Sequence, residues 1–478
     1  MLHGEESLFV SEELISKSAS ELSELIRSRI VSPVEVIESY LQRIDQINPS
    51  LNAIVTLAPD VLDQARARER EVADATTLGP LHGVPVTVKD TIATAGITST
   101  SGSQLLVRYL PDDDAPVVTR LKRAGAVILG KTNTPEMAIP YETDNPVFGR
   151  TNNPNDLNRT AGGSSGGEAA AIAAHVSAAG VGSDLSGSIR VPAHFCGIAG
   201  LKPTTGRVPM DGHIPEASGT LSLGACIGPM ARRVIDLLLL LNVMTDAPHA
   251  VISESDFVER SRQQLRGVRV AYYSDDGVAP VTDDTSNAVE TAAKALTEAG
   301  LQVRAERPPA VSEGSRLWIE LFSRAASEQL REFYRGREEE AGPRVASVLR
   351  QRQENPTFEN KIEMAERTAR AVIERERRRE ELLNWMKTTP LILAPVGAVP
   401  AFEHGADRVI VNHESISTFR AFSYSQTFNV FGFPAVSIPV SRSSEGLPIG
   451  VQIVGRPFED DTVLAAAAII EQSFVGPL

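Results

Sequence analysis

The chain has 478 residues, of which 42% are hydrophobic, and its formal net charge is -14. This length allows a core larger than that of a usual single domain. The negative balance excludes the overall basic footprint of a nucleic-acid binder, so we expect no nucleic-acid partner. Two cysteines exclude a disulfide scaffold and are typical of a reducing compartment.

The N-terminal stretch MLHGEESLFVSEELISKS is acidic, and it lacks the basic start and apolar run of a signal peptide. No stretch reaches the ~18 consecutive apolar residues that a membrane span needs. The longest candidate, Val463 to Ile470, is too short. We therefore expect a soluble, cytoplasmic protein without a membrane span.

Residues 11–76 are predicted to be helical. Ser32 and Glu35 form a capping box in front of a periodic apolar stripe, and Asn48-Pro49 is predicted to end that helix. Asp60 is expected to cap the next helix. These helices are interpreted as packing elements without chemistry.

A short apolar strand, Val86 to Asp90, contains a lysine at its end, Lys89. Burying an ammonium group costs several kcal/mol unless the group is paired or neutral. Taken alone, this pattern favours a snorkelling or ion-paired lysine over a catalytic one.

The remaining predicted elements follow in chain order. They are a helix and a strand within 117–129, an alanine-rich helix after Gly167, a strand, helix and strand within 267–306, a long charged helix at 358–385, strands at 391–396, 433–439 and 449–455, and a last helix from Asp460. Strands that alternate with helices predict an α/β layered fold. We expect helices on both sides of a large mixed, mostly parallel β-sheet.

The stretch Ala161 to Ala193 places two glycine- and serine-rich loops around the alanine-rich run. Glycine tolerates positive φ and lets other groups approach the backbone closely. Two such loops joined by a compact helix indicate a place where backbone N–H groups and hydroxyls converge. We therefore expect the chemistry of the protein here.

Three known motifs could explain the first loop. A phosphate-binding loop fails because Glu168 follows Gly167 where lysine is needed. A dinucleotide-binding loop fails because residues 152–160 are not predicted to be a strand. The third, G-x-S-x-G, would make Ser165 the nucleophile of an α/β-hydrolase-type esterase, with His404 or His413 as its base. It stays open as an alternative, although no strand and no oxyanion motif precede it.

Another interpretation uses the unusual lysine together with both loops. Ser188 lies in a run whose successive N–H groups can form a nest for an oxyanion. A serine hydroxyl is a weak nucleophile that needs a base, and a lysine kept neutral by burial can serve. Lys89 is the candidate base, and Ser164 could relay the proton between the two.

These motifs, VTVKD, GGSSGGEAAA and GSDLSGSIRVPA, together resemble the amidase signature family of amide hydrolases. The resemblance extends to GKTNTPEM, GRTNNPND, PAHFCGIAGLKPTTGRV and FGFPAVSIPV. It implies a Ser–cis-Ser–Lys triad, with Lys89 as base, Ser164 as the bridging serine on a cis peptide and Ser188 as the acylated nucleophile. It also implies one domain over 1–478, with a helical segment at 1–76 and a variable, helix-rich region at about 245–390.

Further site residues follow from the same resemblance. The expected oxyanion and substrate-binding residues are Leu185, Ser186, Gly187, Met137 and Gly163, and those expected to hold the loop are Asp184, Arg190 and Ser165. Ser186 stands where the family usually has glycine, which is expected either to narrow the acyl pocket or to require a φ that serine tolerates less well. The pocket lining is expected from 137–145, from 310–385 and from the loop before Asn429.

The implied function is hydrolysis of a small acyl or aryl carboxamide through a serine acyl-enzyme, releasing ammonia or an amine. No cofactor and no metal are expected, and a homodimer is a possible assembly. The alternative within the family is the glutamine-hydrolysing A subunit of a tRNA-dependent amidotransferase. The absence of that subunit's tyrosine-rich segment from 340–385, and Phe422 where it would have aspartate, favour a stand-alone hydrolase.

Overall fold

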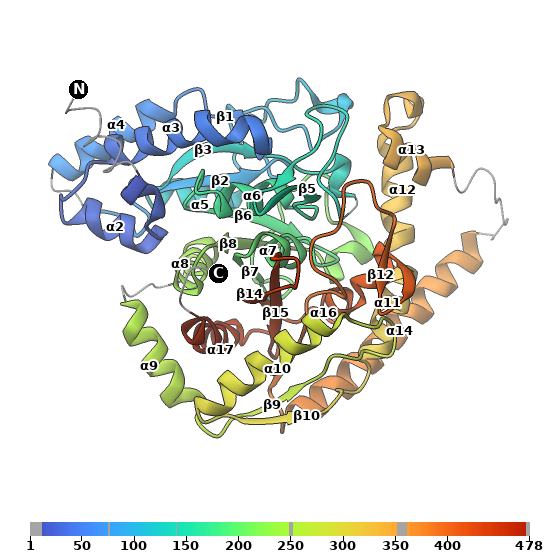
Figure 1. The fold of residues 1–478 in the computed structure, drawn as a ribbon. Helices are drawn as coiled ribbons and strands as arrows, with labels where there is room; N and C mark the ends of the chain where they lie inside the picture. Colours follow the sequence, from blue (N-terminus) through green and yellow to red (C-terminus); the bar gives the residue numbers. More distant parts are fainter. Residues whose placement is uncertain (1–11, 75–76, 140, 248–251, 351–360, 475–478) are drawn as a thin grey trace.

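An 11-stranded sheet runs through the centre of the computed structural model, which describes residues 12–74, 77–139, 141–247, 252–350 and 361–474 (Figure 1). Its strands lie in the spatial order β1-β3-β2-β6-β8-β7-β14-β15-β11-β9-β10. Their bounds are β1 Ile54–Leu57, β2 Pro85–Lys89, β3 Val127–Thr132, β6 Ala179–Asp184, β7 Ala199–Lys202, β8 Cys226–Ala231, β9 Arg269–Tyr272, β10 Gln302–Ala305, β11 Leu391–Pro395, β14 Ala435–Arg442 and β15 Pro448–Val454.

The sheet is mixed, as expected, with two parallel blocks. The strands β3, β2 and β6 pair in parallel at one end, as do β11, β9 and β10 at the other. Between these blocks, and at β1, every described neighbouring pair is antiparallel. The parallel pairing is therefore confined to the two blocks. In the middle, β14 and β15 form a hairpin whose short connection permits only antiparallel pairing.

Helices cover both faces of this sheet, which confirms the α/β fold. The layer with α8, α10 and α17 packs on one face, and the layer with α6, α7 and α16 packs on the other. The helix bounds are α2 Ala19–Arg27, α3 Pro33–Leu51, α4 Val61–Ala73, α5 Pro116–Arg123, α6 Gly166–Ala173, α7 Arg190–Cys196, α8 Val234–Thr245, α9 Glu254–Leu265, α10 Asp283–Glu298, α11 Gly314–Trp318, α12 Arg324–Phe333, α13 Pro343–Arg350, α14 Lys361–Met386, α15 Thr418–Ala421, α16 Ser423–Val430 and α17 Asp460–Ser473. Among the described residues, no helix combines the length and apolar character needed to cross a membrane.

At β11 the two faces of the sheet belong to two different hydrophobic clusters. In β11, Leu391 and Leu393 join the larger cluster, whereas Ile392 and Ala394 join a second one that is rich in aromatic residues. This alternation follows from the period of two in a strand, where successive side chains point to opposite faces. Because both faces are buried, β11 reads as an uninterrupted apolar run in the sequence.

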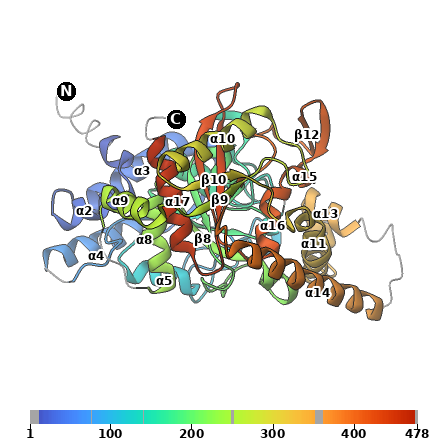
Figure 2. The same ribbon diagram turned by 90° about the horizontal axis from the view of Figure 1, so that it is seen from below.

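The N-terminal helices lie at one side of the molecule, and α11 to α14 lie at the other (Figures 1 and 2). Two local predictions for residues 11–76 are wrong. The strand β1 interrupts the helices at the sheet edge, and α3 continues through Pro49 to Leu51. The proline lies in the last turn, and the Asn48 side chain accepts hydrogen bonds from the N–H groups of Ala53 and Ile54, which end the helix instead.

The prediction that 152–160 contains no strand is also wrong. β4 (Asn152–Asn153) and β5 (Asp156–Thr160) form a two-stranded antiparallel sheet. Their polar composition fits this position, because several of their side chains remain partly or fully exposed. A second such pair, β12 (Arg408–Val411) and β13 (Glu414–Ser417), lies further along the chain.

The long charged helix expected at 358–385 is present as α14, although residues 358–360 lie outside the described ranges. Its charges pair along the helix, where Arg377 and Arg378 both bond to Glu374. Pairs three and four residues apart are neighbours on a helix surface. The charge run is therefore a solvated face, as expected.

Candidate active site

Lys89 is the last residue of β2, and its side chain is fully buried. The parallel pairing of β2 with β6 brings the carboxyl ends of both strands to one edge of the sheet. There the Lys89 Nζ lies 2.6 Å from the Ser164 Oγ and 3.0 Å from the Ser183 Oγ. Two hydroxyl groups thus surround the amine.

Burial lowers the pKa of Lys89 to about 7, because an ammonium group loses its hydration inside the protein. The carboxylates of Asp184 and Glu168 act in the opposite direction and raise the pKa. The net result leaves a substantial neutral fraction near neutral pH. A neutral amine at this position has a lone pair that can accept a proton.

Ser164 stands in the loop between β5 and α6, and the Gly163–Ser164 peptide bond is cis. The Thr134 hydroxyl donates to the Ser164 carbonyl oxygen at 2.9 Å and fixes this part of the loop. At Gly162, φ is +83° and a Cβ would lie 2.9 Å from the Pro192 Cα. Only glycine fits both the conformation and the close approach.

Ser188 lies in the loop between β6 and α7. The Ser188 carbonyl oxygen accepts from the Ser165 N–H at 3.1 Å, which ties the two glycine- and serine-rich loops together. The Asp184 carboxylate accepts from the backbone N–H groups of Gly187 (2.7 Å) and Ile189 (3.1 Å). Asp184 therefore holds the turn that presents Ser188.

Arg190 forms a fully buried ion pair with Asp184, with an Nη2–Oδ1 distance of 3.0 Å. The guanidinium also donates to the side-chain oxygens of Gln452 (2.8 Å) and Asn429 (2.5 Å). Although burial alone would raise it, the pKa of Asp184 is held well below its usual range by Arg190. The carboxylate stays ionised and the loop stays anchored.

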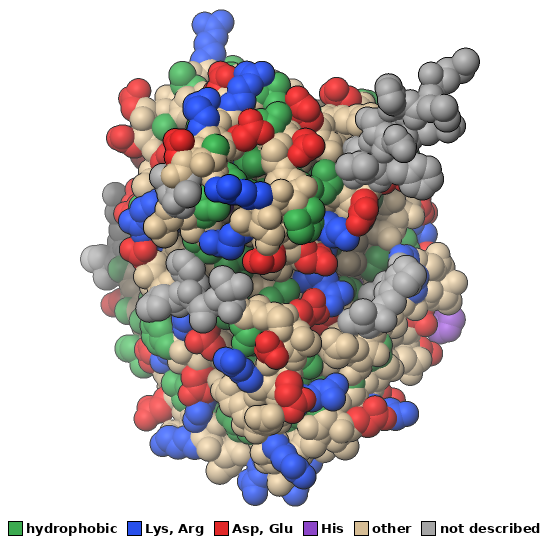
Figure 3. Space-filling view, turned by 90° about the vertical axis from the view of Figure 1, so that its left-hand side faces the viewer, with side chains coloured by type: hydrophobic (Ala, Val, Ile, Leu, Met, Phe, Trp, Pro, Cys, Tyr) green, Lys and Arg blue, Asp and Glu red, His purple; other side chains and the backbone are tan. Residues whose placement is uncertain are grey.

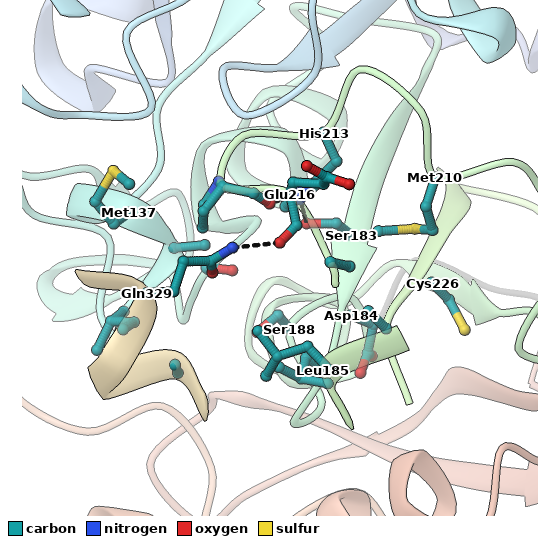
Figure 4. A pocket seen from close by; sticks show the side chains of 18 of the residues that line it. Met137, Ser183, Asp184, Leu185, Ser188, Met210, His213, Glu216, Cys226 and Gln329 are labelled. Atoms are coloured by element: carbon teal, nitrogen blue, oxygen red, sulfur yellow. Dashed lines mark hydrogen bonds between the residues drawn. The ribbon is translucent and has the colours of Figure 1, made fainter. Parts of the chain in front are cut away.

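A pocket opens beside these groups, as Figure 4 shows. Of the predicted site residues, Ser164, Ser188, Asp184, Leu185 and Met137 line it. The region 137–145 contributes Met137, Ala138 and Ile139, and the region 310–385 contributes Ala326, Gln329 and Leu330. Most of the wall is apolar.

Other predicted residues do not line this pocket. The Ser165 hydroxyl donates to the Ser183 carbonyl oxygen at 3.3 Å, so it braces β6 rather than facing a ligand. The Ser186 hydroxyl is hydrogen-bonded to the Tyr141 hydroxyl, so it does not narrow the acyl pocket as expected. The Gly187 N–H already donates to Asp184, and it is therefore not free as an oxyanion donor.

The expectation that the loop before Asn429 lines the pocket is wrong. Phe422 is fully buried and its ring lies 4.5 Å from the ring of Tyr141, between centroids. It belongs to the aromatic cluster of the core. Its identity therefore says little about the ligand.

Several residues around the pocket escaped the sequence analysis, among them Ser183, His213, Glu216 and Gln329. The Gln329 amide donates to the Glu216 carbonyl oxygen at 2.5 Å, so α12 is joined to the loop at 213–217 (Figure 4). His213 and Glu216 stand in a turn-rich segment without periodicity, and only tertiary contacts bring them here. Within the described ranges, no group of three or more His, Cys, Asp or Glu side chains is placed to hold a metal ion.

The family model named Amidase matches residues 35–464. A curated relative, the A subunit of the glutamyl-tRNA(Gln) amidotransferase of Carboxydothermus hydrogenoformans, is 34% identical, and the alignment covers 96% of this chain and 98% of the relative. A bacterial aryl acylamidase of known structure superposes with a TM-score of 0.83 at 27% identity, covering 97% and 99% of the two chains. The structure of the corresponding A subunit from Thermotoga maritima gives a TM-score of 0.74 at 28% identity, covering 97% and 94%.

These relatives correct two predictions. The prediction of a stand-alone hydrolase that acts on small acyl or aryl carboxamides is wrong, because the curated relatives that match over their full length carry the name of an amidotransferase subunit. The expectation of a small-molecule amide substrate and of no nucleic-acid partner is wrong on the same evidence, because that name includes glutamyl-tRNA(Gln).

Both errors have a physical reason. Net charge averages the whole surface, and one component of an assembly does not itself need a basic footprint. On the face shown in Figure 3, basic and acidic side chains are interspersed. The preference for a stand-alone enzyme also depended on Phe422, which packs in the core.

Proposed function

Since the chain belongs to the amidase family, we propose that it is the amide-hydrolysing A subunit of a tRNA-dependent amidotransferase, with Ser188 as the nucleophile. The substrate of its half-reaction is the side-chain amide of glutamine, a linear C–N bond. The products are ammonia and glutamate.

The observation that carries this proposal is the contact between a fully buried Lys89 and Ser164 in the pocket that Ser188 also lines. The full-length identity to amidotransferase A subunits supports the choice of glutamine as the amide. The proposal needs both observations, because the Lys89–Ser164 contact supports amide hydrolysis through a serine and the relatives support glutamine as the substrate.

In the proposed mechanism, neutral Lys89 takes the proton of the Ser164 hydroxyl while Ser164 takes the proton of Ser188. The Ser188 Oγ forms a bond to the amide carbon, and the carbonyl electron pair moves onto its oxygen. The N–H groups of Leu185, Ser186 and Ser188 are the candidate donors to that oxyanion, each worth about 2.7–4 kcal/mol when such a donor acts. The proton then returns through Ser164 to the leaving nitrogen, and ammonia departs.

Water completes the half-reaction by attacking the acyl carbon, and the same relay accepts its proton. The C–O bond to Ser188 breaks, the relay returns the proton through Ser164 to the Ser188 oxygen, and glutamate leaves. Asp184 and Arg190 act through the loop that they anchor, and Ser165 acts through its contact with β6. We assign these three residues positioning roles.

Glu216 provides the proposed recognition of the amino acid. It is an exposed carboxylate on the pocket wall, and free glutamine carries an α-ammonium group. A charge-assisted hydrogen bond between them is stronger than a neutral one. In the proposed assembly, partner subunits bind glutamyl-tRNA(Gln) and receive the ammonia. The cytoplasmic location and the homodimer stay predictions.

The experiment measures ammonia release from glutamine by the purified chain, alone and with the other amidotransferase subunits and glutamyl-tRNA(Gln). We expect slow release by the chain alone and faster release in the complex. Ser188→Ala should abolish release in both. Rapid cleavage of simple amides by the chain alone, with no response of glutamine turnover to the partners, would contradict the proposal.

A further inference from the structure

His213 continues the chain of polar groups that begins at Lys89. Its Nε2 lies 2.9 Å from the Ser183 Oγ, and the Ser183 Oγ lies 3.0 Å from the Lys89 Nζ. Its Nδ1 lies 2.7 Å from the Pro215 carbonyl oxygen. Figure 4 shows His213 and Ser183 on the same wall of the pocket.

The Pro215 carbonyl fixes the direction of these hydrogen bonds. A carbonyl oxygen only accepts, so the His213 Nδ1 carries the proton and donates it. In a neutral imidazole the other nitrogen then accepts, so the Ser183 hydroxyl must donate to Nε2. The Ser183 oxygen is left as an acceptor toward Lys89.

This direction has a consequence for the lysine. A neutral amine has two N–H bonds and one lone pair. If Ser183 can only accept, Lys89 points an N–H at Ser183, and its lone pair remains for the proton of Ser164, 2.6 Å away. With Ser183 free to rotate, its own hydroxyl could donate to that lone pair and block the relay.

We propose that His213 is a positioning residue that, through Ser183, keeps the lone pair of Lys89 directed at Ser164. It touches no reacting atom in this role. The proposal rests on the proposed function, because it requires Lys89 to act as the base for Ser188.

The neutral state that the proposal needs is favoured at the site. Burial lowers the pKa of His213 to about 4, the Pro215 carbonyl raises it, and the positive charge of Lys89 lowers it further. The imidazole is therefore neutral through the pH range in which Lys89 loses its proton.

Three substitutions of His213 test whether its role depends on the hydrogen-bond acceptor at Nε2 or only on the size of its ring. His213→Leu fills similar space without an acceptor, and His213→Asn keeps a donor near Pro215 but ends short of Ser183. His213→Gln places an amide oxygen at about the reach of Nε2. We expect kcat to fall on the order of 10- to 100-fold in the Leu and Asn variants, comparable to the loss of one buried hydrogen bond, with KM little changed. The Gln variant should recover most of the loss.

A double-mutant cycle with Ser183→Ala tests whether His213 acts on Lys89 through Ser183. If His213 acts through Ser183, His213→Leu should cost almost nothing further in the Ser183→Ala background, because groups that act as a unit are not additive. Independent, multiplicative losses would overturn the proposal. A Gln variant as slow as the Asn variant would overturn it too, and this comparison does not require the Leu variant to fold.

Labelling with a fluorophosphonate probe distinguishes this proposal from the proposed function. If the probe labels Ser188 in the wild-type protein, and the labelling rate falls in His213→Leu and recovers in His213→Gln, the result supports both the proposed function and the role of His213. Labelling at Ser188 that is equally fast in all three proteins refutes the role of His213 and leaves the nucleophile standing. Absence of labelling at Ser188 in wild type refutes the proposed function itself.

Discussion

The Lys89 Nζ lies 2.6 Å from the Ser164 Oγ, and neither side chain is accessible to solvent to any real extent. Burial lowers the pKa of Lys89 to about 7. As a base, Lys89 works only when neutral, which is the form present above its pKa. The rate of Ser188 acylation should therefore rise with pH through about 7 and level off above it.

This pH profile is best measured as the rate of fluorophosphonate labelling, since the α-ammonium group of glutamine titrates in a nearby range. Lys89→Met should lower the plateau about 10²- to 10⁴-fold, the usual contribution of a general base, and should remove the rise near pH 7. A profile in Lys89→Met with the wild-type midpoint would show that another group is the base.

A second prediction concerns the two serines that compete for the role of nucleophile. Ser188 lines the pocket, whereas the Ser165 hydroxyl donates to the Ser183 carbonyl oxygen. Ser188→Ala should abolish labelling and glutamine hydrolysis, because no oxygen remains to form the acyl-enzyme. Ser165→Ala should keep the labelled site and lose rate only through a looser β6. Peptide mapping by mass spectrometry identifies the modified serine, and a label on Ser165 would restore the α/β-hydrolase interpretation.

How far the sequence predicted this site depends on whether the signal was local. Lys89 is conspicuous because a lysine at the end of an apolar strand is costly to bury. Ser188 is conspicuous because it ends the glycine- and serine-rich run GSDLSGS. The structure brings Lys89 and Ser164 together, while their catalytic roles stay predictions. The fold class followed from strands that alternate with helices.

His213 and Glu216 carried no such local signal. His213 reaches Ser183 only because β6 and the loop at 213–217 meet in the folded chain. The contact of the Ser186 hydroxyl with the Tyr141 hydroxyl could not be predicted either, since Tyr141 lies 45 residues earlier in the chain. The strand direction in the middle of the sheet likewise depends on tertiary pairing, which periodicity does not encode.

The third prediction is a loss of stability on breaking the Asp184–Arg190 pair. Arg190→Met leaves a buried carboxylate without its charge partner, which typically costs about 3–5 kcal/mol. Arg66→Met is the matched control, because Arg66 and Asp63 form an exposed pair that is worth at most about 1 kcal/mol. Urea unfolding of both variants measures the difference, and equal midpoints would show that the buried pair is dispensable.

The same pair gives a pH dependence of stability with a defined sign. Arg190 holds the pKa of Asp184 below its unfolded value of about 3.9. The contribution of the pair to stability is therefore present above about pH 3.9 and is lost as the pH falls toward the folded pKa. In Arg190→Met, this part of the acid dependence should disappear.

The last prediction concerns substrate recognition by Glu216, an exposed residue that lines the pocket and whose backbone carbonyl accepts from the Gln329 amide. If it binds the α-ammonium group of glutamine, Glu216→Gln should raise KM for glutamine about 5- to 30-fold, the equivalent of about 1–2 kcal/mol. A primary amide without an ammonium group should show an unchanged KM, and kcat should hold for both substrates because Glu216 takes no part in proton transfer. Steady-state kinetics of wild type and Glu216→Gln with both substrates measures these changes in KM and kcat. An equal rise in KM for both would mean that Glu216 shapes the pocket without recognising charge.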